Sequence, residues 1–408
     1  MRKWFRNLAF LAVLGAASAP QAAPPADPIR LETARLQGDR YVAERESGAR
    51  VELTLDPRLQ AATEHSLRRS QIRIGASVVL SIPDGRVLAL AGRSGVDASV
   101  GPSALALRPW APAASIFKIV SAAALIDQAG LSQSTRACYH GGISSVLPDN
   151  LVDDPHDRCA SLAYGVGKSQ NAILAKLAVR YLSPEQLART GRALGFGQPL
   201  EFDVQIEPSH LDVPEDDPLE FARTAAGFWH STLSPMHGAL LAAAIADGGR
   251  MVIPHLVDAI DPGTQPSNQP DPEEEDSADA RICSNAPALP ARQVLSANAA
   301  AEVAEMMAGV TRMGTARSVF HDRQGHQRLP ISAAGKTGTL FGQTIDGPVG
   351  YSWFVGFAPI QHPTVAFAVA LGNKPGARLR ASELVREMLS EYAAAQKEAG
   401  TRWAIVVR

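Results

Sequence analysis

A serine and a lysine stand one helical turn apart in this chain, at Ser115 and Lys118. Residues three apart on a helix lie on the same face, so the lysine is expected to reach the serine hydroxyl. The neighbours of Lys118 are apolar, and a lysine partly removed from water holds its proton less tightly. Ser115 is therefore predicted to be a nucleophile, with Lys118 as the base that activates it.

The residues ahead of Ser115 predict a helix N-terminus. Pro112 precedes the serine closely, and an apolar helical pattern runs from Ser115 to Asp127. Free backbone N–H groups and the helix dipole at such an end favour negative charge. An oxyanion that forms beside Ser115 is expected to be stabilised there.

Two further motifs follow in the chain: Ser169 with Asn171, and Lys336-Thr337-Gly338-Thr339. A Ser-x-x-Lys or a Ser-x-Asn occurs by chance roughly once in a chain of this length. Alone, each motif is equally well explained as a helix cap, a helix start or an edge strand. Lys-Thr-Gly-Thr is much rarer by chance, and the three motifs together suit one site with consistent roles.

The order and separations of these motifs resemble those of the penicillin-binding D,D-transpeptidases, which cross-link peptidoglycan. Further stretches resemble the same domain, at 51–60, 314–316 and 353–359. The resemblance covers about residues 51–395. It implies a serine acyltransferase that acts on D-Ala-D-Ala stem peptides, is acylated by β-lactams and needs no cofactor for catalysis.

The resemblance also implies the catalytic roles. Ser115 attacks the penultimate D-Ala carbonyl, and Lys118 takes its proton. Ser169 relays a proton between the lysine and the leaving amine. The backbone N–H groups of Ser115 and Thr339 form the oxyanion hole.

The remaining motif residues are implied to bind substrate. Asn171 is expected to hydrogen-bond the peptide backbone of the substrate, and Lys336 to supply positive charge. Thr337 and Thr339 offer hydroxyl groups to the terminal carboxylate. Gly338 leaves room for the close approach of the backbone.

Other functions that use the same residues remain open. A D,D-carboxypeptidase shares the acylation machinery, and so does a β-lactamase. The Glu-x-x-Leu-Asn pattern that serves a class A β-lactamase is absent between Asn171 and Lys336. A non-enzymatic sensor of β-lactams or of the cell wall, or a scaffold protein, is the alternative from another class.

The N-terminus has the pattern of a secretory signal peptide at residues 1–22. Three basic residues lie within the first six, followed by the apolar run 8–17 and then by small residues and prolines. The apolar run is shorter than the about 20 residues that a spanning helix needs. An uncleaved anchor on the outer face of the cytoplasmic membrane is the alternative, and both place the protein in the periplasm or an equivalent extracytoplasmic space.

Composition favours one large domain. The chain has 408 residues, of which 46% are hydrophobic, and its formal net charge of −2 provides no basic field for nucleic acid. We expect a tether at 23–50, a transpeptidase domain at 51–408, and a disordered acidic insertion at 261–280. The stretch before residue 51 is too short for a glycosyltransferase domain, which leaves membership of a cell-wall synthesis complex open.

The expected fold class is α+β. Two strands are expected early and three late, at 76–82, 86–91, 331–339, 351–358 and 365–371. Helices are expected at 59–69, 115–127, 171–181, 184–194, 235–246, 298–307 and 382–399. This order predicts a five-stranded antiparallel sheet flanked by helices, with an inserted helical lobe, as in serine β-lactamases and transpeptidases.

Cys138 and Cys159 lie between the first two motifs, with His140 and His156 just inside them. In an oxidising compartment such a cysteine pair is expected to form a disulfide. The same four residues also offer the ligands of a tetrahedral structural zinc site. A disulfide, a zinc site and a pair of free thiols all remain open, and the third cysteine, Cys283, has no evident partner in the sequence.

Overall fold

The computed structural model describes residues 25–69, 72–96, 100–260, 291–345, 347–377 and 379–406. The expected signal peptide at 1–22, the acidic insertion at 261–280 and Cys283 lie outside these ranges. Within them, no helix is both long enough and apolar enough to cross a membrane.

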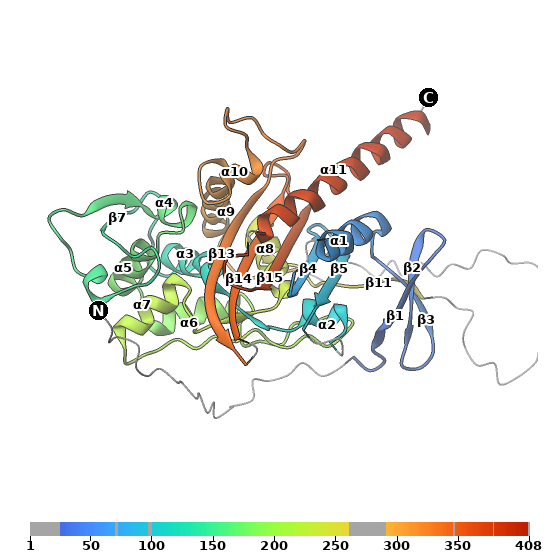
Figure 1. Cartoon of the computed structure of the whole chain (residues 1–408), viewed down its shortest axis with the longest axis horizontal. Coiled ribbons are helices and arrows are strands. Elements are labelled where there is room, and N and C mark those ends of the chain that lie inside the picture. Colours follow the sequence, from blue (N-terminus) through green and yellow to red (C-terminus); the bar gives the residue numbers. More distant parts are fainter. Residues whose placement is uncertain are drawn as a thin grey trace, which may run out of the picture.

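A five-stranded antiparallel sheet forms the centre of the molecule (Figure 1). Its order is β13 (Ala334–Thr344), β14 (Gly347–Ala358), β15 (Val365–Asn373), β4 (Ile74–Ser81) and β5 (Val87–Ser94). This confirms the expected sheet of two early and three late strands. β13 continues five residues beyond Thr339, where we expected the strand to end.

Helices cover both faces of the sheet. In β15 large and small apolar residues alternate as VAFAVALGN, so that both faces of this strand are apolar and need to be covered. Its large residues share a core cluster with α1 (Pro57–Arg69) and α11 (Ala381–Val406). The alanines between them point to the opposite face and share a cluster with α8 (Pro235–Ala246). α2 (Pro102–Leu107) also lies in that second cluster.

α8 is apolar on all sides, as expected for a helix that is buried throughout. Its Gly238 allows close packing, because a Cβ there would lie 3.1 Å from Ala368 Cβ and 3.3 Å from Val355 Cγ2. The small residues of the helix therefore match the small residues of the sheet.

The helical lobe lies beside β13 (Figure 1). It contains a 3-10 turn and six helices: η1 (Ala114–Phe117), α3 (Lys118–Asp127), α4 (Leu162–Gly167), α5 (Asn171–Tyr181), α6 (Pro184–Ala193), α7 (Pro218–Ala226) and α9 (Ala297–Arg312). The bounds of α5 and α8 agree with those expected, whereas α2, α4 and α7 were not anticipated. Each of these three is short, with six to nine residues, so its hydrophobic period is hard to recognise.

Several further described elements are short. They are β6 (Ala111–Pro112) with β9 (Thr232–Leu233), β7 (Arg136–Tyr139) with β8 (Arg158–Ser161), β10 (Arg250–Met251) with β12 (Arg292–Gln293), η2 (Pro148–Leu151) and α10 (Arg317–Phe320).

A second sheet corrects the expectation of a tether at 23–50. β1 (Ile29–Gln37), β2 (Arg40–Arg45) and β3 (Arg50–Leu53) are joined by β11 (Val257–Ile260) in the order β1-β2-β3-β11. Apolar side chains from β1 to β3 are buried in the main core cluster. The fourth strand comes from about 200 residues later in the chain, so local composition does not reveal this sheet.

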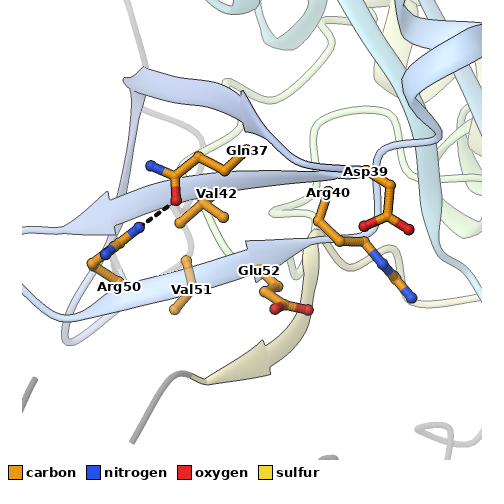
Figure 2. A pocket seen from close by; sticks show the side chains of 7 residues that line it. All are labelled: Gln37, Asp39, Arg40, Val42, Arg50, Val51 and Glu52. Atoms are coloured by element: carbon orange, nitrogen blue, oxygen red, sulfur yellow. Dashed lines mark hydrogen bonds between the residues drawn. The ribbon is translucent and has the colours of Figure 1, made fainter. Parts of the chain in front are cut away.

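A hollow of about 380 Å³ opens on this small sheet. Figure 2 shows Gln37 and Arg50, which are hydrogen-bonded, together with Glu52 and Arg40 around it. None of the residues expected to form the catalytic site lines this hollow.

Candidate active site

Ser115 lies in the 3-10 turn η1, which runs directly into α3. The strand ahead of it is held from two sides. Trp353 Nε1 donates a hydrogen bond of 2.9 Å to Pro112 O, and the Ala113 N–H donates one of 3.0 Å to Ser231 O. The serine is therefore fixed at the start of a helix, as the sequence predicts.

The backbone just before the nucleophile is strained. Ala114 has a φ of 50°, which is uncommon for a residue other than glycine. Gly227 packs against it so closely that a Cβ there would lie 2.2 Å from Ala114 O. Such conformations persist where the surroundings over-determine them, often at functional sites.

Lys118 Nζ lies at the centre of the site and is fully buried. It is 2.9 Å from Ser115 Oγ, 2.6 Å from Asn171 Oδ1 and 2.5 Å from Ala226 O. A neutral amine has two N–H groups and one lone pair. The two N–H groups match the two carbonyl oxygens, which leaves the lone pair to accept the Ser115 hydroxyl proton. This arrangement is the one that a general base requires.

The electrostatics favour that neutral form. Burial, and then the charge of Lys336, hold the pKa of Lys118 well below its ordinary value. Burial also lowers the pKa of Lys336, to about 7. Within the described residues, the hydrogen bonds and ion pairs of these two lysines include no carboxylate, so nothing offsets the cost of burying their charges.

Ser169 contacts the second lysine. Lys336 Nζ donates to Ser169 Oγ at 2.9 Å and to Thr337 O at 2.9 Å. The resemblance implies a proton relay between Lys118 and the leaving amine through Ser169, and in the structure the lysine that is hydrogen-bonded to Ser169 is Lys336. Ser169 also has a positive φ, 56°, in the turn that leads into α5.

Asn171, at the start of α5, bridges Lys118 to a neighbouring loop. Its Oδ1 accepts from Lys118 Nζ, and its Nδ2 donates to Ile143 O at 2.9 Å. Both ends of the amide are therefore occupied by protein groups, and in this arrangement Asn171 orients Lys118.

β13 forms the far wall of the site and is the edge strand of the sheet. Gly338 is required by close packing, because a Cβ there would lie 3.2 Å from Ile116 Cγ1 and 3.4 Å from Ala113 O. Thr337 Oγ1 lies 2.6 Å from Thr315 Oγ1, and Thr339 is exposed. Thr315 belongs to the 314–316 stretch, which had no assigned role.

Two backbone carbonyls of the site were not expected from the sequence, Ala226 O and Ile143 O. Ala226 ends α7, and Ile143 lies in the loop between β7 and β8. Backbone groups leave no signature in residue type, so only the packing of these segments reveals them.

Cys138 and Cys159 form a disulfide. The pairing of β7 with β8 places the two residues directly opposite each other, where side chains are close. In this arrangement the two sulfurs are bonded to each other, whereas the alternative zinc site with His140 and His156 would need both as thiolates. His140 instead contacts Asp157, at 2.5 Å, and His156 is exposed.

Lys176, on α5, is hydrogen-bonded to the hairpin of β7 and β8 that carries the disulfide. Its buried Nζ donates to Cys138 O and to Asp157 Oδ2, both at 2.9 Å. The hydrogen bond from Lys176 is the main cause that lowers the pKa of Asp157 to about 2. The same hairpin loop provides Ile143 O, so these contacts support the position of Asn171.

Residues 75–390 match the family model described as the penicillin binding protein transpeptidase domain. The chain therefore belongs to the penicillin-binding-protein transpeptidase family. Peptidoglycan D,D-transpeptidase PbpA of Mycobacterium tuberculosis is 25% identical over an alignment of 359 residues, and the match covers 80% of this chain and 68% of the relative. Stage V sporulation protein D of Bacillus subtilis is 25% identical over an alignment of 356 residues, and the match covers 81% of this chain and 50% of that protein.

Solved structures share the fold. Penicillin-binding protein A from M. tuberculosis, in an acyl-enzyme complex with ceftriaxone, has a TM-score of 0.64 and 24% identity, and the match covers 84% of this chain and 80% of that one. The transpeptidase domain of penicillin-binding protein 3 from Burkholderia pseudomallei has a TM-score of 0.64 and 20% identity, with 84% and 96% covered. These likenesses confirm the expected α+β fold.

Proposed function

We propose that this family member is a peptidoglycan D,D-transpeptidase that works through an acyl-enzyme on Ser115. The observation that carries the proposal is the position of Lys118 Nζ, whose two carbonyl partners leave its lone pair for the Ser115 hydroxyl. Ser115 Oγ attacks the penultimate D-Ala carbonyl as Lys118 takes its proton. The backbone N–H groups of Ser115 and Thr339 receive the oxyanion.

The pair of Ser169 and Lys336 provides the second proton route. Ser169 gives its proton to the leaving D-Ala amine and recovers one from Lys336, with which it is hydrogen-bonded. A lysine with a pKa near 7 can both give and regain a proton near neutral pH. The amine of a second stem peptide then attacks the ester carbonyl and gives its proton through Ser169 to Lys336. The C–O bond to Ser115 breaks as Lys118 returns its proton to Ser115 Oγ.

Substrate binding is assigned to three residues of β13, of which Thr339 is exposed, Thr337 is half-buried and Lys336 is buried. Thr337 and Thr339 present hydroxyl groups, and Lys336 supplies the charge, for the terminal carboxylate of the donor peptide. β-Lactams carry an equivalent carboxylate and are expected to acylate Ser115. The acyl-enzyme complexes of the M. tuberculosis protein with ceftriaxone, imipenem and penicillin G support this assignment.

The site of action follows from the substrate. Peptidoglycan lies outside the cytoplasmic membrane, and residues 1–22 have the pattern of a signal peptide or anchor that would take the chain there. The disulfide of Cys138 and Cys159 suits an oxidising compartment. The proposal includes a transpeptidase domain at 51–408 and stem peptides as partners. It also includes attachment to a cell-wall synthesis complex, which affinity purification from membranes would test.

A fluorescent penicillin tests the nucleophile. Covalent labelling should be lost in Ser115→Ala and suppressed nearly as far in Lys118→Ala, because the nucleophile loses its base. Ser134→Ala, which removes an exposed serine, is the matched control and should label like wild type. Equal labelling of wild type and Ser115→Ala would overturn the assignment.

Products formed from a pentapeptide donor separate the related activities. A transpeptidase forms a cross-linked product when an amine acceptor is present, whereas a carboxypeptidase releases D-Ala and forms only the shortened peptide with or without the acceptor. A sensor or scaffold forms neither product.

A further inference from the structure

Three residues other than glycine have a positive φ in the described part of the chain: Ala114, Ser169 and Trp229. The first precedes the nucleophile and the second belongs to the site. Trp229 has a φ of 52°, and the His230 N–H donates to Phe228 O across it at 2.6 Å. This is a γ-turn of the rare positive-φ form, which is strained for a bulky residue. Its side chain is nevertheless 54% exposed, so burial of the ring does not explain the strain.

The Trp229 turn lies between the nucleophile and β13. It starts at Gly227, where a Cβ would lie 3.2 Å from Ser115 Cα. Two residues later the indole lies against Gly342, where a Cβ would come within 2.7 Å of Trp229 Cη2. Gly342 is on the same face of β13 as Lys336 and Gly338, because side chains alternate along a strand.

Contacts on both sides hold the turn. His230 Nε2 lies 2.8 Å from Glu220 Oε2, and Glu220 is paired with Arg223 at 2.5 Å. The Asp212 N–H donates to His230 O at 2.8 Å. These contacts fix the residue after Trp229 and hold the strained conformation in place.

The direction of β13 decides what the indole faces. In the proposed function, the donor carboxylate binds at Lys336 and Thr337, and the reacting carbonyl lies at Thr339. The acyl part of the donor therefore extends toward Gly342, which is about 10 Å further along the strand. Trp229 stands at that position, on the face of β13 that meets the nucleophile.

We propose that Trp229 is a specificity-determining residue whose indole forms an apolar wall for the acyl side chain of the donor. This inference rests on the proposed function. The group that would pack against the indole is a planar or apolar one on the acyl side of the scissile amide, because an aromatic ring is a favourable surface for such groups.

Two penicillins that differ only in this group provide the test. Benzylpenicillin has an aromatic acyl side chain, whereas 6-aminopenicillanic acid has the same bicyclic nucleus and a bare amine. Trp229→Gly should lower the second-order rate constant for acylation of Ser115 by benzylpenicillin about 5- to 10-fold, and that for 6-aminopenicillanic acid by less than about twofold. Glycine accepts the positive φ without strain, so this variant is expected to fold.

Further variants and outcomes make the test decisive. Trp229→Phe retains a ring and should keep most of the benzylpenicillin rate, and Tyr181→Ala, which removes an exposed aromatic from the end of α5, should leave both rates unchanged. Equal losses for both penicillins, or no loss for either, would overturn the inference while leaving the nucleophile assigned. Failure of both to acylate wild type at Ser115 would reject the proposed function and the inference with it.

Discussion

Two buried lysines that contact no carboxylate in the described residues determine the chemistry of the site. A buried lysine normally pairs with an acid, because an isolated charge is costly to remove from water. Here burial and mutual repulsion weaken the hold of Lys118 on its proton. Lys336, with a pKa near 7, can exist in either form near neutral pH. In the proposed function, Lys118 is therefore the neutral base and Lys336 the proton donor.

The pH dependence of acylation should report this division. In the protein without ligand, the pKa of Lys336 is about 7. Above that pH Lys336 loses the charge that attracts the ligand carboxylate, so the second-order rate constant for acylation by benzylpenicillin should fall. Lys336→Arg keeps its charge at all these pH values, so the alkaline limb should move to higher pH even where the maximal rate is lower. An alkaline limb that stays near 7 in Lys336→Arg would assign it to another group.

The penicilloyl-enzyme should decay slowly. Hydrolysis needs a water activated on the open face of the ester, and the hydrogen bonds of the described catalytic residues include no carboxylate. Glu207 is an acidic residue that could be considered as the base for this water, but in the structure its carboxylate pairs with Arg108 at 2.8 Å. We expect the ester to persist for many minutes, as measured by loss of a fluorescent label after excess ligand is removed. Rapid turnover of a chromogenic cephalosporin that disappears in Ser115→Ala would favour a β-lactamase.

At the scale of elements, the site assembles where three segments end against one another. The 3-10 turn η1 provides Ser115, the turn between α4 and α5 provides Ser169, and β13 provides Lys336. Strained backbone at Ala114 and Ser169 lies where these ends meet. The hairpin of β7 and β8 adds a support, because its loop holds the amide of Asn171 through Ile143 O.

Loss of the disulfide should loosen that support. Cys138 and Cys159 are 21 residues apart, and opening a loop of this size costs about 3 kcal/mol of stability by chain entropy. Cys138→Ser combined with Cys159→Ser should lower the midpoint of urea unfolding and slow penicillin labelling. Cys283→Ser is the matched control, and it should change neither measurement.

Intact mass and metal analysis of oxidised wild type separate the two readings of the cysteines. The disulfide predicts a mass lower by two hydrogens than that of the reduced protein and no bound zinc. Stoichiometric zinc with two masked thiols would support the metal site, and two freely alkylated thiols in folded, metal-free protein would reject both.

At the scale of the whole molecule, one buried histidine lies beneath the sheet. His237, on α8, has its Nε2 2.8 Å from Leu194 O, whereas its Nδ1 has no hydrogen-bond partner in the structure described. Its ring packs 4.7 Å from that of Phe196, centroid to centroid. Burial lowers the pKa of His237 to about 4, so the folded protein keeps this histidine neutral.

Stability should therefore depend on pH through His237. Its pKa is about 6.5 when unfolded and about 4 when folded, so the unfolded state binds more protons between these values. The stabilising contribution is complete above pH 6.5 and is lost as the pH falls toward 4, by up to about 3 kcal/mol. Urea unfolding should show this loss in wild type, and His237→Gln should lose less over the same range. His326→Gln, at an exposed site, should behave like wild type; an unchanged pH dependence in His237→Gln would contradict the assignment.

Much of the fold can be predicted from the sequence where local patterns are strong. The apolar period and the Pro and Gly boundaries predict α8 at Pro235–Ala246, and the pattern after Gln170 predicts α5. The alternating late strands and the early hairpin predict the central sheet. These signals are local, because each depends only on residues that are neighbours in the chain.

The sequence by itself determined the family resemblance. It also supplied the prediction that Ser115 is the nucleophile and Lys118 its base, because both depend on residue type and on spacing within one helical turn. Only the tertiary structure decided that Ser169 pairs with Lys336 and that Asn171 is held by Ile143 O. It also decided that residues near the start of the chain pair with β11, and that the Trp229 ring lies on Gly342. The physical reason is that these contacts join segments far apart in the chain, and such contacts depend on how the whole core packs.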